Sequence, residues 1–210
     1  AALVVELPAH AVALIELRLG LTRRNLRASS SFLADVVQWG ERASRRVITD
    51  ELTGVYNRPF LEDALENFFE ISKSNGKPVA FLMMDVDNFR EINAAVGRER
   101  ADAVIVRVVG IIRGVISSHG IIARYGGDEF SILLPEADLD RALSIAGEIR
   151  AAVQGADFSD IASGLPPVTT SIGVSAFPDT AADLAAFREK ADASLYRAKE
   201  MGRNRVEAVR

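Results

Sequence analysis

The sequence predicts an α/β fold in which a mixed sheet is flanked by helices. Two observations lead to this prediction. Apolar runs of strand length alternate along the chain with segments of helical periodicity. One pair of neighbouring strands is also separated by a tight glycine turn, as in a β-hairpin, so antiparallel pairing joins the α/β series.

The predicted elements follow one another in a regular order after a turn-rich entry at residues 49–57, which Gly54 and Pro59 punctuate. We expect a helix at 58–75 and a buried strand at 79–84, followed by a short segment that ends at Gly97. A long helix is expected at 101–117 and a hairpin within 120–135. The remaining expected elements are a helix at 139–153, a strand within 168–177 and a helix at 184–201 closed by Gly202.

Residues 1–48 are predicted to form a separate helical segment, followed by one domain at 49–210. Leu14, Leu17 and Leu21 have the alternating spacing of three and four residues that is typical of a helical seam. Two alternatives stay open. The segment is either a signalling or dimerising coil that links the domain to an upstream sensor, or a helix that packs on the domain behind it.

Composition narrows the chemistry. The chain has 210 residues, of which 49% are hydrophobic, enough for a sizeable core. Its 25 basic and 29 acidic residues give a net charge of -4, which argues against general nucleic-acid binding. The absence of cysteine excludes disulfides and thiolate sites, and two histidines argue against a zinc site or a Ser-His-Asp triad. Chemistry would therefore use Asp, Glu, Lys and Arg, with or without a hard metal ion.

The chain carries no apolar run long enough to suggest a membrane span. Its first residues lack an initiator Met and the basic region of a signal peptide. We expect a cytoplasmic domain of a longer protein, whose upstream part would hold a sensory domain and could include a membrane anchor.

Acidic residues occur at two predicted strand ends. Asp128 and Glu129 lie at the hairpin tip after two glycines, and Asp85 and Asp87 follow the strand at 79–84. A Gly-Gly-Asp-Glu turn alone is also typical of a solubilising surface turn. If the strand and the hairpin are neighbours in one sheet, however, three or four carboxylates converge at one edge. Such a group would require a hard divalent cation, and magnesium in nucleotide sites is held by one or two carboxylates and substrate phosphates.

Other residues fit a phosphate ligand beside these acids. Gly126 and Gly127 lack a Cβ and allow a bulky ligand to approach the backbone. Lys199 and Arg203 have the i, i+4 spacing that places two cations on one face of a helix end, and Arg90 is a third candidate. The alternative for the first two is that cations simply favour the C-terminal end of a helix.

Five motifs in order resemble the GGDEF family of diguanylate cyclases between residues 49 and 206. They are "DELTGVYNR", "MDVDNFREIN", "RYGGDEF", "TTSIGVS" and "ADASLYRAKEMGRN". The resemblance implies a palm-like α/β domain related to adenylate cyclase catalytic domains. It also implies an enzyme that condenses two GTP molecules into cyclic di-GMP with release of pyrophosphate. Each protomer of a homodimer would hold one GTP, with Mg²⁺ or Mn²⁺ as the cofactor.

The resemblance also implies the roles of individual residues. Asp85 and Asp128 would bind metal, the carbonyl of Val86 would be a further ligand, and Glu129 would activate the 3′-hydroxyl and also touch metal. Asn93 and Asp102 would read the guanine base. The residues expected to surround the phosphates are Asn88, Phe89, Arg90, Gly126, Gly127, Lys199 and Arg203.

The sequence departs from the family pattern at several positions. Arg90 replaces a Lys, and Ala94, Arg98 and Ala101 replace residues around the expected base site, which affects its geometry rather than the metal site. These changes leave open the alternative of a catalytically inactive GTP-binding signalling module.

A further departure concerns regulation. Ser117 and Gly120 stand where many relatives carry the Arg and Asp of an inhibitory product site. We therefore expect no product inhibition through these positions.

Overall fold

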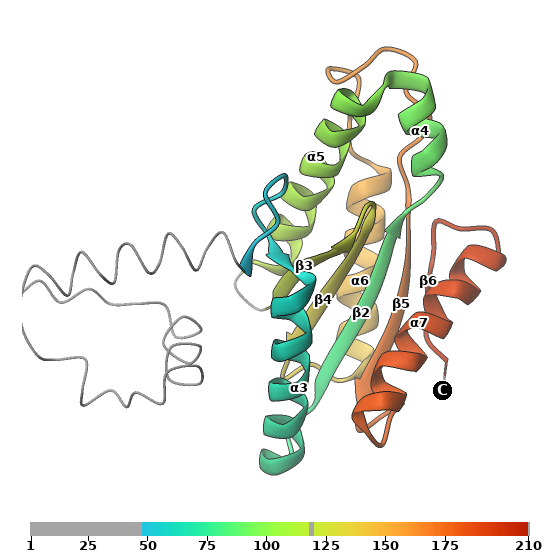
Figure 1. Ribbon diagram of the computed structural model, residues 1–210. Coiled ribbons are helices and arrows are strands. Elements are labelled where there is room, and N and C mark those ends of the chain that lie inside the picture. Colours follow the sequence, from blue (N-terminus) through green and yellow to red (C-terminus); the bar gives the residue numbers. More distant parts are fainter. Residues whose placement is uncertain (1–47, 118–119, 210) are drawn as a thin grey trace, which may run out of the picture. The chain divides into compact units, whose positions relative to one another are not determined.

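The computed structural model describes residues 48–117 and 120–209, and these residues form a mixed sheet with helices on both faces (Figure 1). The expected helical segment at 1–48 lies outside the described residues, apart from Ile48. The elements are β1 (Tyr56–Asn57), α3 (Arg58–Asn75), β2 (Val79–Val86), α4 (Phe89–Val96), α5 (Arg98–Ile116), β3 (Ile121–Gly126), β4 (Glu129–Pro135), α6 (Leu139–Gln154), β5 (Thr170–Phe177), α7 (Leu184–Glu200) and β6 (Val206–Glu207).

The sheet has six strands in the order β1-β3-β4-β2-β5-β6. The four inner strands pair antiparallel, and the short edge strands β1 and β6 pair parallel to their neighbours. The predicted α/β class with a mixed sheet and a β3–β4 hairpin is thereby confirmed. Strand β2 lies between β4 and β5, so that Asp85 is directly opposite Glu129 on one side and Ser171 on the other.

Alternate residues of β2 face two different helical layers. Phe81 packs beside Phe187 of α7, whose ring also lies 5.5 Å from that of Phe69 in α3. Leu82 and its neighbours on the other face join the large core cluster built with α5 and α6. Asp85 is four residues beyond Phe81 and therefore belongs to the face that α3 and α7 cover (Figure 1).

Helix boundaries follow local signals. Helix α3 begins after Asn57, whose side chain accepts a hydrogen bond from the Phe60 amide at 3.1 Å, and ends at Gly76 with φ 71°. Its predicted bounds are confirmed. Helix α5 begins three residues earlier than predicted, the segment before Gly97 is the helix α4, and β2 extends past Asp85. The two-residue strands β1 and β6 are too short to show alternation and were not predicted.

None of the described helices combines the length and the apolar character needed to cross a bilayer.

The backbone of helix α7 lies very close to that of β5 at Gly173. An ideal Cβ at this glycine would lie 2.1 Å from the Leu195 nitrogen and 2.2 Å from the Ala191 oxygen, both backbone atoms of α7. No side chain can be accommodated at position 173 unless the helix moves away from the sheet.

We therefore predict that Gly173→Ala lowers the free energy of unfolding by about 3 kcal/mol or more, because backbone atoms cannot yield as side chains do. The matched control is Gly110→Ala in α5, where an added Cβ meets nothing within 4 Å. It should be neutral or stabilise the protein by up to about 1 kcal/mol. Urea unfolding measures both, and equal stabilities of the two variants would contradict the close packing of α7.

Candidate functional site

The hairpin tip and the end of β2 meet at one edge of the sheet. Residues Gly127 and Asp128 form the turn between β3 and β4, and Gly127 has φ 48°, which glycine adopts without strain. The Asp128 carbonyl accepts a hydrogen bond from the Val86 amide at 3.2 Å. An added Cβ at Gly126 or Gly127 would meet nothing within 4 Å, so the space beside the turn is open.

Asp85 is a buried carboxylate with a cationic partner. Its side chain is 12% exposed, and the Lys199 ammonium lies 2.7 Å from its Oδ2 atom. Burial raises the pKa of Asp85 to about 6. Lys199 opposes this rise, and the charges of Asp128 and Glu129 add to it. Three carboxylates are therefore close enough to repel one another, with one ammonium to offset them.

This group of acids suits a hard divalent cation, because a positive charge would relieve the repulsion. Oxygen ligands from Asp85, Glu129, Asp128 and the Val86 carbonyl are the type that Mg²⁺ prefers. Among residues 48–117 and 120–209, however, no three acidic or histidine side chains are arranged closely enough to enclose a metal by themselves. The expected convergence of three carboxylates at one sheet edge is nonetheless present, since Asp85 lies opposite Glu129 and is affected by the charges of Asp128 and Glu129. A metal here would take further ligands from a substrate.

Asp87 does not belong with the candidate metal ligands, because its carboxylate is already hydrogen-bonded to other parts of the fold. It is 2% exposed, and its carboxylate accepts hydrogen bonds from the Ser171 hydroxyl at 2.6 Å, the Thr169 hydroxyl at 2.7 Å and the Asn204 amide at 3.0 Å. Both oxygens are thus occupied by donors from β5 and from the chain after α7. Asp87 is a structural acid in this position.

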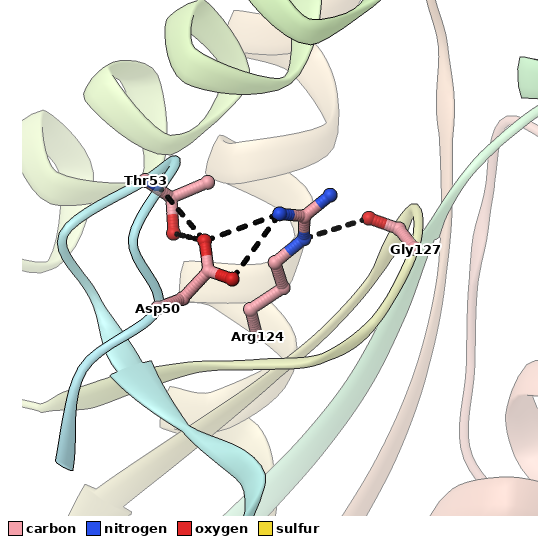
Figure 2. Close-up of polar contacts among 4 residues, drawn as sticks. All are labelled: Asp50, Thr53, Arg124 and Gly127. Carbon is pink, nitrogen blue, oxygen red and sulfur yellow. Dashed lines mark hydrogen bonds and ion pairs between the residues drawn. The ribbon is translucent and has the colours of Figure 1, made fainter. Parts of the chain in front are cut away.

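A network that sequence reasoning missed holds the hairpin tip (Figure 2). The Arg124 guanidinium donates to the Gly127 carbonyl at 2.8 Å and to both carboxylate oxygens of Asp50 at 3.1 and 3.2 Å. Asp50 also accepts from the amide and the hydroxyl of Thr53. Burial alone would raise the pKa of Asp50, but the hydrogen bonds from Thr53 and the charge of Arg124 lower it below its usual value. The spacing of Asp50 and Thr53 is a local turn signal, whereas Arg124 is distant in sequence.

The two candidate phosphate cations do not share a helical face. Helix α7 ends at Glu200, with Lys199 in its last turn. Arg203 lies beyond the helix with φ 62° and is exposed. The expectation of an i, i+4 helical pair is wrong, because the chain turns out of the helix before Arg203.

The candidate base-reading and phosphate residues after β2 lie on α4 and α5. Phe89 is half-buried against the core, and Arg90 is exposed in the first turn of α4. Asn93 is exposed on α4 and Asp102 is half-buried on α5, with Gly97 between the two helices. Neither Asn93 nor Asp102 hydrogen-bonds through its side chain to another residue that the structure describes.

Glu129 is reached from the face of the sheet that α3 and α7 cover. A cavity of about 230 Å³ lies between these helices over Phe81 and Met83 and includes Glu129 and Arg188 in its lining. Glu129 as a whole is half-buried and contributes to the wall of this cavity.

Comparisons with known proteins agree with these features. A family model described as "Diguanylate cyclase, GGDEF domain" matches residues 47–205. Diguanylate cyclase DgcP of Pseudomonas aeruginosa is 34% identical over 80% of this chain and 25% of its own length. Response regulator PleD of Caulobacter vibrioides is 35% identical over 76% of this chain and 35% of its own length. The chain thus spans only a quarter to a third of these relatives.

Solved structures match as well. The coiled coil and GGDEF domain of DgcB from Caulobacter crescentus, in complex with c-di-GMP, superposes with a TM-score of 0.78 at 28% identity, covering 85% of this chain and 94% of that one. The GGDEF domain of YfiN (TpbB) from Pseudomonas aeruginosa has a TM-score of 0.70 at 34% identity, covering 76% of this chain and 92% of that one.

The raised pKa of Asp85 predicts a pH-dependent effect of Asp85→Asn on the metal-free protein. Above pH 6 the folded chain bears a buried charge that Asn lacks, so the variant should be more stable, by on the order of 2 kcal/mol. The gain should shrink as pH falls from 6 toward 3.8 and vanish below, where the carboxyl is protonated in the folded and unfolded chains alike.

Urea unfolding in EDTA at several pH values measures this effect, with the exposed Asp140→Asn in α6 as the control. A variant less stable than the wild type at pH 7.5 would mean that the ion pair with Lys199 outweighs the cost of burial.

Proposed function

Because the chain belongs to the GGDEF family of diguanylate cyclases, we propose that it condenses two GTP molecules into cyclic di-GMP with release of two pyrophosphates. The observation that carries the proposal is the pairing of Asp85 with Glu129 across β2 and β4, with the hairpin acid Asp128 beside them and Lys199 2.7 Å from Asp85. Acids and a cation are thereby assembled beside an open glycine turn.

The cofactor in this proposal is Mg²⁺ or Mn²⁺, held by the carboxylates of Asp85, Asp128 and Glu129 and by the Val86 carbonyl. Such an ion neutralises phosphate charge and polarises the α-phosphate for attack. Lys199, which neutralises Asp85 in the metal-free chain, would bind the β- and γ-phosphates together with Arg203. Catalysis then depends on position and charge rather than on a covalent enzyme intermediate.

Substrate choice is assigned to two side chains. A carboxylate at Asp102 can accept from the N1–H and the exocyclic amine of guanine, whereas adenine has an acceptor at N1. Asn93 adds a second polar contact from α4. Phe89 and Arg90 would contribute the backbone at the start of α4 to the phosphates, as Gly126 and Gly127 would at the hairpin tip.

Glu129 is proposed to take the proton of the attacking 3′-hydroxyl. The reaction joins two nucleotides that are held by different protomers, so a homodimer is required for turnover. The catalytic unit would be residues 49–210 of a cytoplasmic domain in second-messenger signalling. Residues 1–48 would link it to an upstream sensory domain.

We predict that the protein forms cyclic di-GMP and pyrophosphate from GTP and Mg²⁺. Asp85→Asn and Asp128→Asn should each lower turnover by about 100-fold or more, as expected when charge stabilisation of a transition state is removed. Asp140→Asn, on the opposite side of the sheet, is the control and should retain activity. Chromatography of the nucleotides at several protein concentrations measures product.

GTP binding without product at high protein concentration would instead favour the inactive signalling module, for which Ala94 beside Asn93 is the motivating departure. Unchanged turnover in either Asn variant would overturn the metal assignment.

We also predict that added cyclic di-GMP does not inhibit through residues Ser117 and Gly120. Ser117 cannot form the ion pairs of an Arg, and an added Cβ at Gly120 would lie 2.8 Å from Leu134 Cδ2 and 3.0 Å from the Leu133 carbonyl oxygen. A side chain at Gly120 is thus opposed by β4 itself. Calorimetry with cyclic di-GMP checks this, and tight binding that Ser117→Ala weakens would contradict it.

A further inference from the structure

A left-handed turn follows α7 and requires support from elsewhere in the fold. Gly202, Arg203 and Asn204 have φ values of 109°, 62° and 47° in succession. For a residue with a Cβ this conformation costs roughly 1–2 kcal/mol, less for Asn. The turn lies between the last helical turn, which contains Lys199, and strand β6.

Among the described residues, five hydrogen bonds hold this turn, the first from the Gly202 amide to the Lys199 carbonyl at 3.3 Å. The Arg203 amide donates to the Ala198 carbonyl at 3.0 Å, and the Asn204 side chain accepts from Arg150 at 3.1 Å. The Arg205 carbonyl accepts from the Ile172 amide at 2.9 Å. The fifth is the bond of 3.0 Å from the Asn204 backbone amide to the carboxylate of Asp87, which follows directly after β2.

The carboxylate of Asp87 is itself held in place by its neighbours. Its two hydroxyl donors, Ser171 and Thr169, fix the carboxylate in one orientation, so the bond to Asn204 is made by a group that is already held. None of the ion pairs among the described residues involves Asp87. Asp85 lies two residues earlier, in β2, so the end of this strand bears a candidate metal ligand and the residue just after the strand anchors the turn that carries Arg203.

We propose that Asp87 is a positioning residue that holds Arg203 in place for the substrate phosphates. The role rests on the proposed function, because it presupposes that the phosphates of GTP reach Lys199 and Arg203. Asp87 itself touches neither metal nor nucleotide. It acts by fixing the backbone of Asn204, next to the exposed Arg203.

The test compares two changes at one position. Asp87→Ala removes the bond from the Asn204 backbone amide to residue 87. Asp87→Asn keeps the bond from the Asn204 amide through its carbonyl oxygen and can donate its amide to Ser171. A positioning role therefore predicts loss in the Ala variant and retention in the Asn variant. A role as metal ligand or as buried charge predicts loss in both.

The probe is 3′-deoxy-GTP with Mg²⁺, which lacks the attacking hydroxyl and so binds without condensing, compared with 3′-deoxyguanosine. Asp87→Ala should weaken the nucleotide by about tenfold, the loss of one hydrogen bond to a charged group. It should leave the nucleoside affinity unchanged, and Asp87→Asn should bind the nucleotide within about twofold of the wild type. The double variant Asp87→Ala/Arg203→Ala should bind no more weakly than Arg203→Ala.

Four results would overturn the role: equal loss in the Asn and Ala variants, parallel weakening of the nucleoside, additive losses in the double variant, or unchanged nucleotide binding in Asp87→Ala. Failure of the wild type to bind 3′-deoxy-GTP would overturn the proposed function and this role together. If Asp87→Ala does not fold, Asp87→Ser makes the same test, because its hydroxyl is too short to reach Asn204.

Discussion

The end of β2 carries a buried negative charge, and the surrounding structure is arranged to compensate for it. Asp85 lies between Glu129 and Ser171 in the sheet, where water cannot solvate it fully. Its compensation comes from Lys199, which reaches it from the end of α7. Helix α7 therefore supplies a counter-charge for Asp85 as well as packing contacts on β5.

Two carboxylates, Asp85 near the end of β2 and Asp87 just beyond it, have different roles because their surroundings differ. Asp87 is surrounded by two hydroxyls and a backbone amide, all of them donors that need no counter-charge. Asp85, two residues earlier, meets an ammonium and two other acids. The fixed hydrogen-bond donors around Asp87 stabilise its charge and give it a structural role. Asp85 is partly desolvated and close to other acids, and these surroundings suit a residue that binds a metal ion.

Local signals in the sequence predicted much of this fold. The Asn57 cap, Pro59 and Gly76 define α3, and the apolar run from Val79 identifies the central strand. The pairing of that strand with the hairpin stood only as a condition in the sequence analysis, and the sheet order supplies it. Those signals extend over a few neighbouring residues or over the length of a single helix or strand.

What could not be predicted depends on tertiary contacts. The role of Asp87 required knowing that residue 204 returns beside β2, and the exit of Arg203 from α7 required the turn that Asp87 supports. The bond between Asp50 and Arg124 joins residues 74 positions apart, for which one sequence carries no pairing signal. Ion pairs at such separations become visible only when the sheet order is known.

The backbone contact at Gly173 also determines which parts of the site can adjust. Side-chain layers between a helix and a sheet allow small sliding movements, because rotamers can change as the surfaces shift. At Gly173 the backbone of α7 lies directly on β5, with no side chain between them. The helix therefore cannot slide along the sheet at this point by rotamer changes. Any change in the reach of Lys199 must therefore come from its own four-carbon chain, and the turn beyond the helix is the first point at which the backbone can flex.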